Sequence, residues 1–207
     1  MLKVGDRNVE ESSTANNLGY IKESWNAPDI TPEMQTVTIT KVTDNPTWGA
    51  LYLQYSDRLS NVQKTKGNIL NIEKQLFITR SVNNRQELIP VNTGNVHIGD
   101  KLIVRLVINL TRDMEYVCLK DFRAACFQPV QQLSGIRWQS GTMYYEDTKD
   151  ATTNFFFDRL GKGTYVIEYP VWINQDGLFQ NGIATLQCLY APEFISHSTT
   201  TEIKVTP

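Results

Sequence analysis

The stretch "KLIVRLVINL", residues 101–110, decides the fold class of this chain. Apolar residues occupy every second position, namely Leu102, Val104, Leu106, Ile108 and Leu110. Lys101, Arg105 and Asn109 fall on the opposite face of an extended chain. Strict alternation of this length, rich in β-branched residues, predicts a β-strand with one face buried.

A second stretch, "GTYVIEYPVWI" at residues 163–173, repeats the alternation. Glu168, Pro170 and Trp172 share its more polar face. Proline has no backbone N–H and cannot donate to a neighbouring strand, so this strand is predicted to lie at a sheet edge or to contain a bulge.

The remaining strands are predicted from shorter runs of the same kind. They are residues 36–42, 47–55, 69–79, 114–121, 136–146, 152–158, 182–190 and 200–206. Turn signals separate them, and the dipeptide Asp176-Gly177 between two apolar runs predicts a hairpin. No long helical stripe is present. Many short strands with regular turns predict an all-β fold, an antiparallel β-sandwich.

The composition changes along the chain. Residues 1–35 are polar and rich in loop formers, with only 2–4 and 20–25 strand-like, whereas the alternating pattern is continuous after residue 68. The sequence therefore predicts a partial β domain over 1–56, a linker over 57–67 and a β-sandwich domain over 68–207.

Bulk properties exclude several partners. The formal net charge is -2 and no basic block is visible, which argues against nucleic acid. No apolar run approaches the roughly 20 residues that span a bilayer, so no membrane insertion is expected. The N-terminus lacks the apolar segment of a signal peptide, which by itself indicates a cytoplasmic protein. Three cysteines fit neither a disulfide framework nor a structural zinc site.

The stretch "GIATLQCLYAPEFISHS", residues 182–198, contains Cys188, Glu193 and His197. These residues could form a metal site, a nucleophile with its base, or only the end of a strand. Cys188 shares a face with Leu186 and Tyr190, as an inert buried cysteine does, and zinc needs three or four ligands. We therefore expect a strand that ends before Pro192 and a solvated loop that carries His197.

Other chemical candidates are weaker. His97 lies in a turn, and Glu146, Asp147 and Asp121 could be paired carboxylates for glycoside chemistry. A polar loop over "YYEDTKDATT" explains the acids more simply, and Cys118 and Cys126 are expected to be free, buried thiols. The sequence thus predicts no enzyme, no catalytic residue, no cofactor and no metal. Several aromatic residues could line a sugar-binding face, but core packing is favoured for them: Trp48, Tyr52, Tyr55, Trp138, Tyr144, Tyr145 and Phe155–Phe157.

Two longer runs, "DMEYVCLKDFRAACFQPVQQLSG" (113–135) and residues 152–198, carry a family resemblance. Together they resemble the C-terminal macroglobulin domain (MG10) of bacterial α-2-macroglobulin-like proteins, the counterpart of the receptor-binding domain of the animal proteins, over residues 68–207. The matching pieces, in order, are Val117–Asp121, Ala124–Ala125, Gln128–Val130, Phe155–Phe157, Gly163–Tyr169, Gly177–Phe179 and Tyr190–Glu193.

The resemblance implies an immunoglobulin-like, macroglobulin-type sandwich within a large protease trap. The segment "WGALYLQYSD" (48–57) resembles the last strand of a CUB-like domain, so residues 1–56 look like the half that follows an inserted thioester-type domain. Such a parent would be periplasmic or attached to the outer membrane, although the N-terminus of this segment lacks the apolar stretch of a signal peptide. None of the three cysteines is followed by a glutamine three residues later, so no covalent trapping chemistry is implied here.

The implied partners are other domains of the parent and, through the parent, proteases. Either the face with Lys101, Arg105 and Asn109 or the face with Glu168 and Trp172 is a candidate interface. Two alternatives remain open. A standalone carbohydrate-binding or adhesion sandwich would need exposed aromatics beside polar groups. An enzyme would need Cys188 or Cys118 within hydrogen-bonding reach of His97 or His197.

Overall fold

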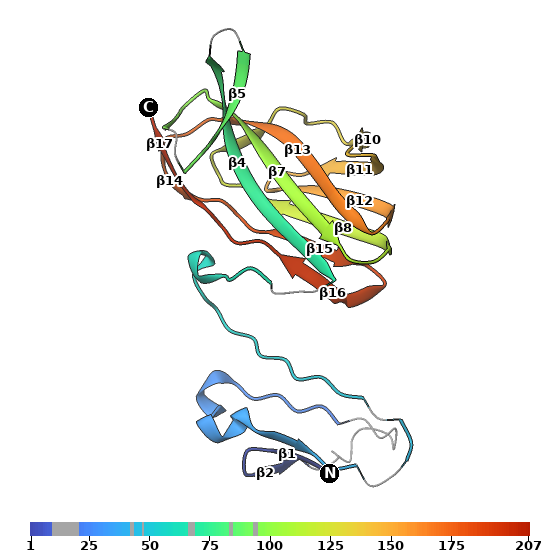
Figure 1. Cartoon of the computed structure of the whole chain (residues 1–207). Helices are drawn as coiled ribbons and strands as arrows, with labels where there is room; N and C mark the ends of the chain where they lie inside the picture. The colour runs from blue at the N-terminus through green and yellow to red at the C-terminus, as the bar shows by residue number, and fades with distance from the viewer. Residues whose placement is uncertain (10–20, 42–43, 47, 66–68, 83–84, 93–94) are drawn as a thin grey trace. The chain divides into compact units, whose positions relative to one another are not determined.

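A computed structural model describes residues 1–9, 21–41, 44–46, 48–65, 69–82, 85–92 and 95–207 (Figure 1). The chain divides into two compact units, Met1–Gln54 and Tyr55–Pro207. Among the described residues, no helix has both the length and the apolar character that crossing a membrane requires.

The first unit is built on a small antiparallel sheet. Its strands are β1 (Leu2–Val4), β2 (Arg7–Val9) and β3 (Val37–Ile39), in the order β2-β1-β3. Two short 3-10 helices precede β3, η1 (Ala27–Asp29) and η2 (Pro32–Gln35). At Gly5 the backbone has φ +58°, and a Cβ atom would lie 2.9 Å from the carbonyl carbon of Glu33, so only glycine fits the turn.

Two strands expected in the N-terminal part do not form in its described residues. Residues 21–26 and 48–58 belong to no helix and to no sheet. Trp48 is 83% exposed and Tyr52 is 89% exposed. The prediction of strands here is wrong for the described residues, because a strand needs a hydrogen-bonded neighbour as well as an alternating pattern. Residues 20 and 47 lie outside the described residues.

The second unit is a sandwich of two larger sheets with a third, smaller sheet at one end. The six-stranded sheet has the order β10 (Gly135–Gln139), β11 (Thr142–Thr148), β12 (Thr152–Leu160), β8 (Met114–Phe122), β15 (Ala184–Cys188), β16 (Ala191–His197). The five-stranded sheet has the order β5 (Arg85–Pro90), β4 (Leu70–Val82), β7 (Lys101–Leu110), β13 (Gly163–Ile173), β9 (Phe127–Pro129). The predicted antiparallel β-sandwich is confirmed.

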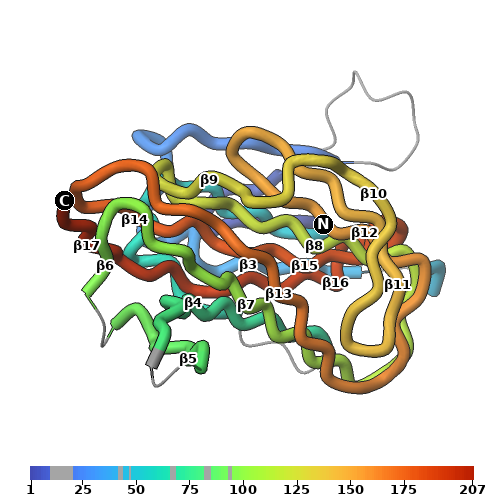
Figure 2. Tube along the Cα trace, turned by 90° about the horizontal axis from the view of Figure 1, so that it is seen from above, coloured from blue at the N-terminus to red at the C-terminus, as the bar shows by residue number. Residues whose placement is uncertain are grey.

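The third sheet lies near the C-terminus (Figure 2). It consists of β14 (Gly177–Gln180), β17 (Glu202–Thr206) and β6 (Val96–His97), in the order β14-β17-β6. The pair β17–β6 is parallel, whereas the pair β14–β17 is antiparallel. A short 3-10 helix, η3 (Leu59–Asn61), precedes the sandwich.

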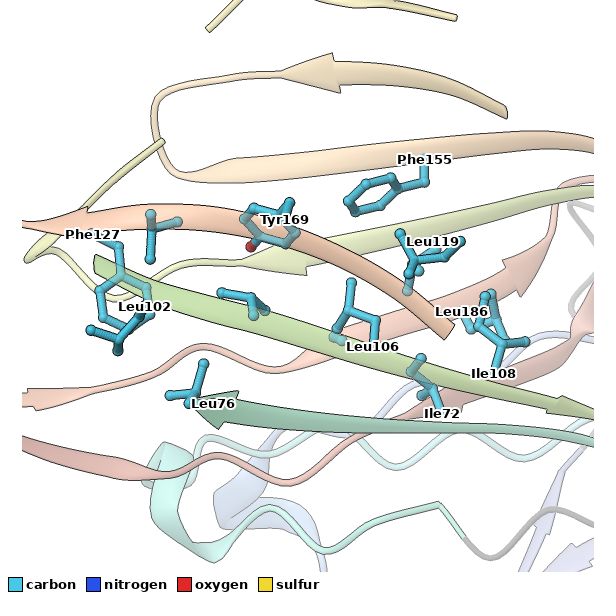
Figure 3. Close-up of a cluster of buried hydrophobic side chains, with 14 of the residues drawn as sticks. Ile72, Leu76, Leu102, Leu106, Ile108, Leu119, Phe127, Phe155, Tyr169 and Leu186 are labelled. Carbon is cyan, nitrogen blue, oxygen red and sulfur yellow. The ribbon is translucent and has the colours of Figure 1, made fainter. Parts of the chain in front are cut away.

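The core fills the space between the two large sheets (Figure 3). The five inward-facing apolar residues of β7 are all buried, as the opening stretch predicts. Phe155 and Phe157 of β12 and Leu119 of β8 face them from the six-stranded sheet. Side chains of this size contribute about 1.5–3 kcal/mol each when fully buried, so this alternation is the main source of stability.

Pro170 occupies an edge position. The amides of Val166 and Glu168 point away from β7 and donate to Ser140 Oγ and Gln139 Oε1, each at 3.0 Å. Pro170 is the next residue on that side, where no donor is required, and β9 pairs only with the residues that follow it, from Val171 onward. The register with β7 is continuous from Gly163 to Trp172, so no bulge is found there. β13 lies between β7 and the edge strand β9 and forms no strand ladder on that side before Val171.

Three expected elements differ from the structure. Residues 136–146 form a hairpin of β10 and β11 rather than one strand, because Ser140 and Gly141 both take positive φ (54° and 74°) and reverse the chain. Asp176-Gly177 closes no hairpin, since β14 pairs with β17 instead of β13.

The third difference concerns His197, which ends β16 rather than lying in a loop. Pro192 is tolerated inside β16 because this strand is at the edge of its sheet, next to a register shift at Gln187/Cys188.

The C-terminal strands form a ribbon that changes sheet. β14 and β17 pair in the small sheet, and their continuations β15 and β16 pair in the six-stranded sheet. The crossover at residues 181–183 and 198–201 is held by polar groups: Ser198 N donates to Ala184 O at 2.9 Å, and Ser198 Oγ accepts from Ala184 N at 2.9 Å. We call this crossover the ribbon corner.

Candidate functional site

The residues of the predicted strand end do not form a catalytic pair. Cys188 is 3% exposed and faces the core, where its Sγ lies 3.6 Å from Met114 Sδ. His197 pairs across the strands with Thr185, on the outer face of the same sheet, and its Nδ1 lies 3.3 Å from Ser198 O. The two side chains therefore lie on opposite faces of the sheet.

The other cysteine–histidine combinations are also separated. Cys118 is on the outer face, where its neighbours in the register are Phe156 and Gln187. His97 belongs to the small sheet, with Nδ1 2.9 Å from Thr206 Oγ1. The described residues contain no cluster of three or more histidine, cysteine or acidic side chains placed to hold a metal ion.

All three cysteines are free, as expected for Cys118 and Cys126. Cys126 is buried and Cys118 is only partly so. Burial raises the pKa of the Cys126 thiol to about 11 and raises the thiol pKa of Cys118 and Cys188 as well. A nucleophilic cysteine needs the opposite shift, because the thiolate is the reactive form.

We therefore expect Cys126 and Cys188 to resist a thiol reagent at neutral pH while the chain is folded, and Cys118 to react more slowly than free cysteine. All three should react at once in denaturant, which serves as the control. Mass spectrometry of the time course measures the number of modified thiols. A thiol that reacts faster than free cysteine would support the alternative that the chain is an enzyme with a cysteine nucleophile.

The acidic residues lie on strands, not in the predicted polar loop. Glu146 is buried on β11, and its Oε2 lies 3.7 Å from Arg137 Nε. Asp147 pairs with Lys149 at 3.2 Å. Only residues 149–151 form the turn between β11 and β12. Burial raises the pKa of the Glu146 carboxyl group, and the positive charge of Arg137 opposes that shift.

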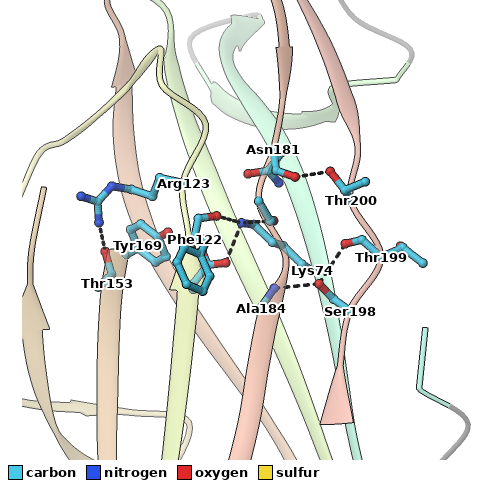
Figure 4. A network of polar contacts seen from close by, with 12 residues as sticks. Lys74, Phe122, Arg123, Thr153, Tyr169, Asn181, Ala184, Ser198, Thr199 and Thr200 are labelled. Carbon is cyan, nitrogen blue, oxygen red and sulfur yellow. Dashed lines mark hydrogen bonds and ion pairs between the residues drawn. The ribbon is translucent and has the colours of Figure 1, made fainter. Parts of the chain in front are cut away.

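Asp121 belongs to a polar cluster in the interior that the sequence analysis did not predict. Figure 4 shows the cluster around Lys74 and Tyr169. Lys74 Nζ lies 2.5 Å from Asp121 Oδ1, and the two side chains are 1% and 0% exposed. Tyr169 donates its hydroxyl hydrogen to Asp121 Oδ2 at 2.5 Å. Arg123, beside this cluster, donates to Thr153 Oγ1 at 2.5 Å. Lys74 is on β4 and Asp121 is on β8, so the ion pair joins the two large sheets.

A signal for this cluster was present in the sequence. In "LNIEKQLFI" Lys74 takes the place of an apolar residue between Ile72 and Leu76, and in "VCLKD" Asp121 continues the inward face of Val117 and Leu119. One cation and one anion on the buried faces of two strands indicate a buried pair, because unpaired buried charges are rare.

The outer face of the five-stranded sheet, predicted as an interface, is paired within itself. Arg105 Nε lies 2.5 Å from Glu168 Oε1, and Thr164 Oγ1 donates to Asn109 Oδ1 at 2.7 Å. Lys101 Nζ lies 5.9 Å from the ring centre of Trp172, within cation–π range. This surface already satisfies the charges that would recognise a partner.

The outer face of the six-stranded sheet is different. Five large apolar side chains stand side by side on β10, β11 and β12, since the register pairs Ile136 with Tyr145, Trp138 with Met143, and Tyr145 with Phe156. We call these five residues the aromatic face. Their exposed fractions, in chain order, are 67%, 72%, 52%, 47% and 37%. Directly opposed residues lie about 4.5–5.5 Å apart at Cβ, so the five form one continuous patch.

The expectation that the aromatics pack in the core is therefore correct for only part of the set. Tyr144, Phe155 and Phe157 are buried, and their rings contact one another at centroid distances of 5.4–5.6 Å. The exposed members are Trp48, Tyr52, Tyr55, Trp138, Tyr145 and Phe156. On β11 and β12 the two groups alternate, as the pleat requires.

Known structures share this fold. A Salmonella alpha-2-macroglobulin reacted with methylamine is 15% identical, with a TM-score of 0.55, over 70% of this chain and 10% of that one. An Escherichia coli alpha-2-macroglobulin activated by porcine elastase is 12% identical, with a TM-score of 0.54, over 70% of this chain and 14% of that one. An E. coli alpha-2-macroglobulin fragment from domain MG7 to the C-terminus is 12% identical, with a TM-score of 0.54, over 72% of this chain and 25% of that one.

The sequence itself gives the family. Residues 70–193 match the family model of the bacterial alpha-2-macroglobulin MG10 domain. The chain belongs to this family, and the predicted macroglobulin-type sandwich is confirmed. It spans only 10–25% of the length of the three solved proteins. Comparison with curated proteins gave no match.

Proposed function

We propose that this chain is the C-terminal part of a bacterial α-2-macroglobulin-like protease trap, and that its sandwich takes part without catalysing a reaction. The family match and the fold shared with an E. coli protein activated by elastase support the trap. In this proposal residues 1–56 are half of a CUB-like domain, 57–67 are a linker, and the parent works outside the cytoplasm.

The observation that carries the proposal is the aromatic face. Aromatic residues and methionine are enriched in the centre of protein interfaces, and charged residues are depleted there. The face has that composition, while the opposite outer surface pairs its own charges. Since the chain spans only a small part of the solved proteins, we propose that another folded domain of the parent covers this face. Its docking would position the sandwich when the trap closes.

Sugar binding is supported less well by the same residues. Trp138 and Tyr145 are exposed, as a carbohydrate site requires, but Ile136 and Met143 stand between them and offer no strong hydrogen-bonding group. A sugar needs several such groups beside the stacking ring.

Side-chain oxidation in the full parent protein would locate the interface. Trp138 is 72% exposed in this structure and Trp172, on the other sheet, is 43% exposed. If the aromatic face is covered, Trp138 should be oxidised more slowly than Trp172 in the parent, the reverse of their order here. Faster oxidation of Trp138 would show that the face is free.

The variant Trp138→Ser should weaken docking of the sandwich by about 2 kcal/mol or more, roughly thirtyfold, as loss of a central interface tryptophan does. Trp172→Ser is the matched control and should change docking little. Trapping is measured with trypsin, as loss of cleavage of a large substrate while a small substrate is still cleaved. A parent that leaves both activities of trypsin intact would contradict the trap.

A further inference from the structure

The contact between Lys74 and Asp121 has an unusual geometry. Nζ lies 2.5 Å from Oδ1, yet Oδ1 has no hydrogen-bond partner. Lys74 instead donates to two backbone carbonyls, Phe122 O at 2.7 Å and Gly182 O at 2.9 Å (Figure 4). The nitrogen is thus held against the carboxyl group without the approach of an ordinary N–H···O hydrogen bond.

These contacts fit a neutral amine. A neutral –NH₂ group has two N–H bonds and one lone pair. The two carbonyls accept the two N–H bonds, which leaves the lone pair on the side of the Asp121 carboxyl group. In a positively charged lysine a third N–H would occupy the position of this lone pair.

Burial acts against the charged form of both partners. Burial lowers the pKa of the Lys74 amine and raises the pKa of the Asp121 carboxyl, although the opposite charge of each partner opposes the shift of the other. Water is excluded, since the side chains are 1% and 0% exposed. An amine and a carboxylic acid held in contact in a dry site have a very high effective concentration for each other.

The second oxygen of the Asp121 carboxyl group accepts a hydrogen bond that would assist a reaction at the carbonyl carbon. Tyr169 donates a hydrogen bond to Oδ2 at 2.5 Å. A donor at this position stabilises the negative charge that forms on oxygen when a nucleophile adds to the carbonyl carbon. Tyr169 is on β13, so three strands of the two large sheets position the three groups.

We propose that Lys74 and Asp121 condense to form an amide cross-link between the two sheets. The Nζ lone pair forms a bond to Cγ, and Oδ2 takes the charge under the hydrogen bond from Tyr169. One proton then passes from nitrogen to the protonated Oδ1, the Cγ–Oδ1 bond breaks, and one water molecule leaves. The product keeps one N–H, which donates to one of the two carbonyls. No oxidant or other reactant is needed.

The cross-link would connect β4, the first strand of the sandwich, to β8 in the other sheet. The sheets could then not separate even when their hydrogen bonds are lost. This inference does not rest on the proposed function, since it concerns the interior of one domain.

Mass spectrometry tests the proposal directly. The denatured wild-type chain should weigh less than its sequence by the mass of one water molecule, and a digest of the full parent protein should contain one linked peptide with residues 74 and 121. Lys74→Arg cannot form the amide and should have its full sequence mass. A wild-type chain of full mass, with unlinked peptides in the parent, would overturn the proposal and leave an ion pair only.

The role of Tyr169 has its own readout. Protein recovered unfolded from inclusion bodies and then folded should lose water over time. Tyr169→Phe should slow this loss about a hundredfold, as removal of one such donor does in other reactions, while retaining the aromatic ring in the core. An unchanged rate would remove Tyr169 from the reaction, and a mass that never changes in the wild type would again overturn the cross-link.

Discussion

Lys74→Met is expected to lower the free energy of unfolding of the sandwich by about 3–5 kcal/mol, because it leaves the buried Asp121 carboxyl group without its partner. Asp121 is 0% exposed and keeps only the hydrogen bond from Tyr169. Phe122 O and Gly182 O lose their donor in the same variant. For a domain of this size the melting temperature should fall by about 6–20 °C. Urea denaturation followed by fluorescence measures the change.

Two controls separate the buried pair from the loss of a charge. Lys162→Met removes an exposed lysine and should change stability by less than about 0.5 kcal/mol. The double variant Lys74→Met with Asp121→Leu replaces the pair by apolar side chains and should recover most of the loss. A double variant as unstable as the single one would mean that Lys74 acts mainly through the two carbonyls or through the cross-link.

Gly182→Ala is expected to have the second large effect. A Cβ at residue 182 would lie 2.4 Å from Phe122 Cβ and 2.7 Å from Phe122 O. Two of the three nearest atoms belong to the backbone of β8, which cannot turn aside as a flexible side chain can. Overpacking of this kind costs about 1–3 kcal/mol and sometimes more, and here it would also disturb the carbonyls that hold Lys74.

Gly161→Ala is the matched control for this substitution. Its Cβ would meet only the ends of side chains, with Tyr165 Oη at 3.5 Å as the nearest atom. Equilibrium unfolding of both variants should show a loss for residue 182 and little change for residue 161. Equal stability of the two variants would show that the ribbon corner can relax.

The sequence predicts a structural feature well where the pattern of a single strand determines it, and poorly where the feature depends on which strands pair. The alternation in 101–110 and 163–173 is long, and every inward-facing apolar position of 101–110 is buried. The hairpin at 135–148 was missed because its turn, Ser140-Gly141, is short and lies inside a continuous apolar pattern. The Asp176-Gly177 signal was misread because the partner of β14 is β17, more than 20 residues away in sequence.

The candidate sites show the same division. The buried state of Cys188 followed from its own strand, whereas the aromatic face requires the register of β10, β11 and β12 to bring five residues together. The predicted interface around Arg105 and Glu168 stays a prediction, and the pattern of each strand did not show that the two residues are neighbours across β7 and β13 and pair with each other. Local patterns show which face a residue occupies, and only pairing shows what it meets.

The ribbon corner also sets the order in which the chain can be completed during synthesis. β8 gains its second neighbour only when residues 184–188 have left the ribosome, and β6 gains its parallel partner only with residues 202–206. Until then the inner edge of β8 is open, and open strand edges pair readily with other chains. In a nascent chain this edge of β8 therefore stays open from Phe122 until Ala184 and the residues after it have been made, and a chaperone that covers the edge would protect the chain during that time.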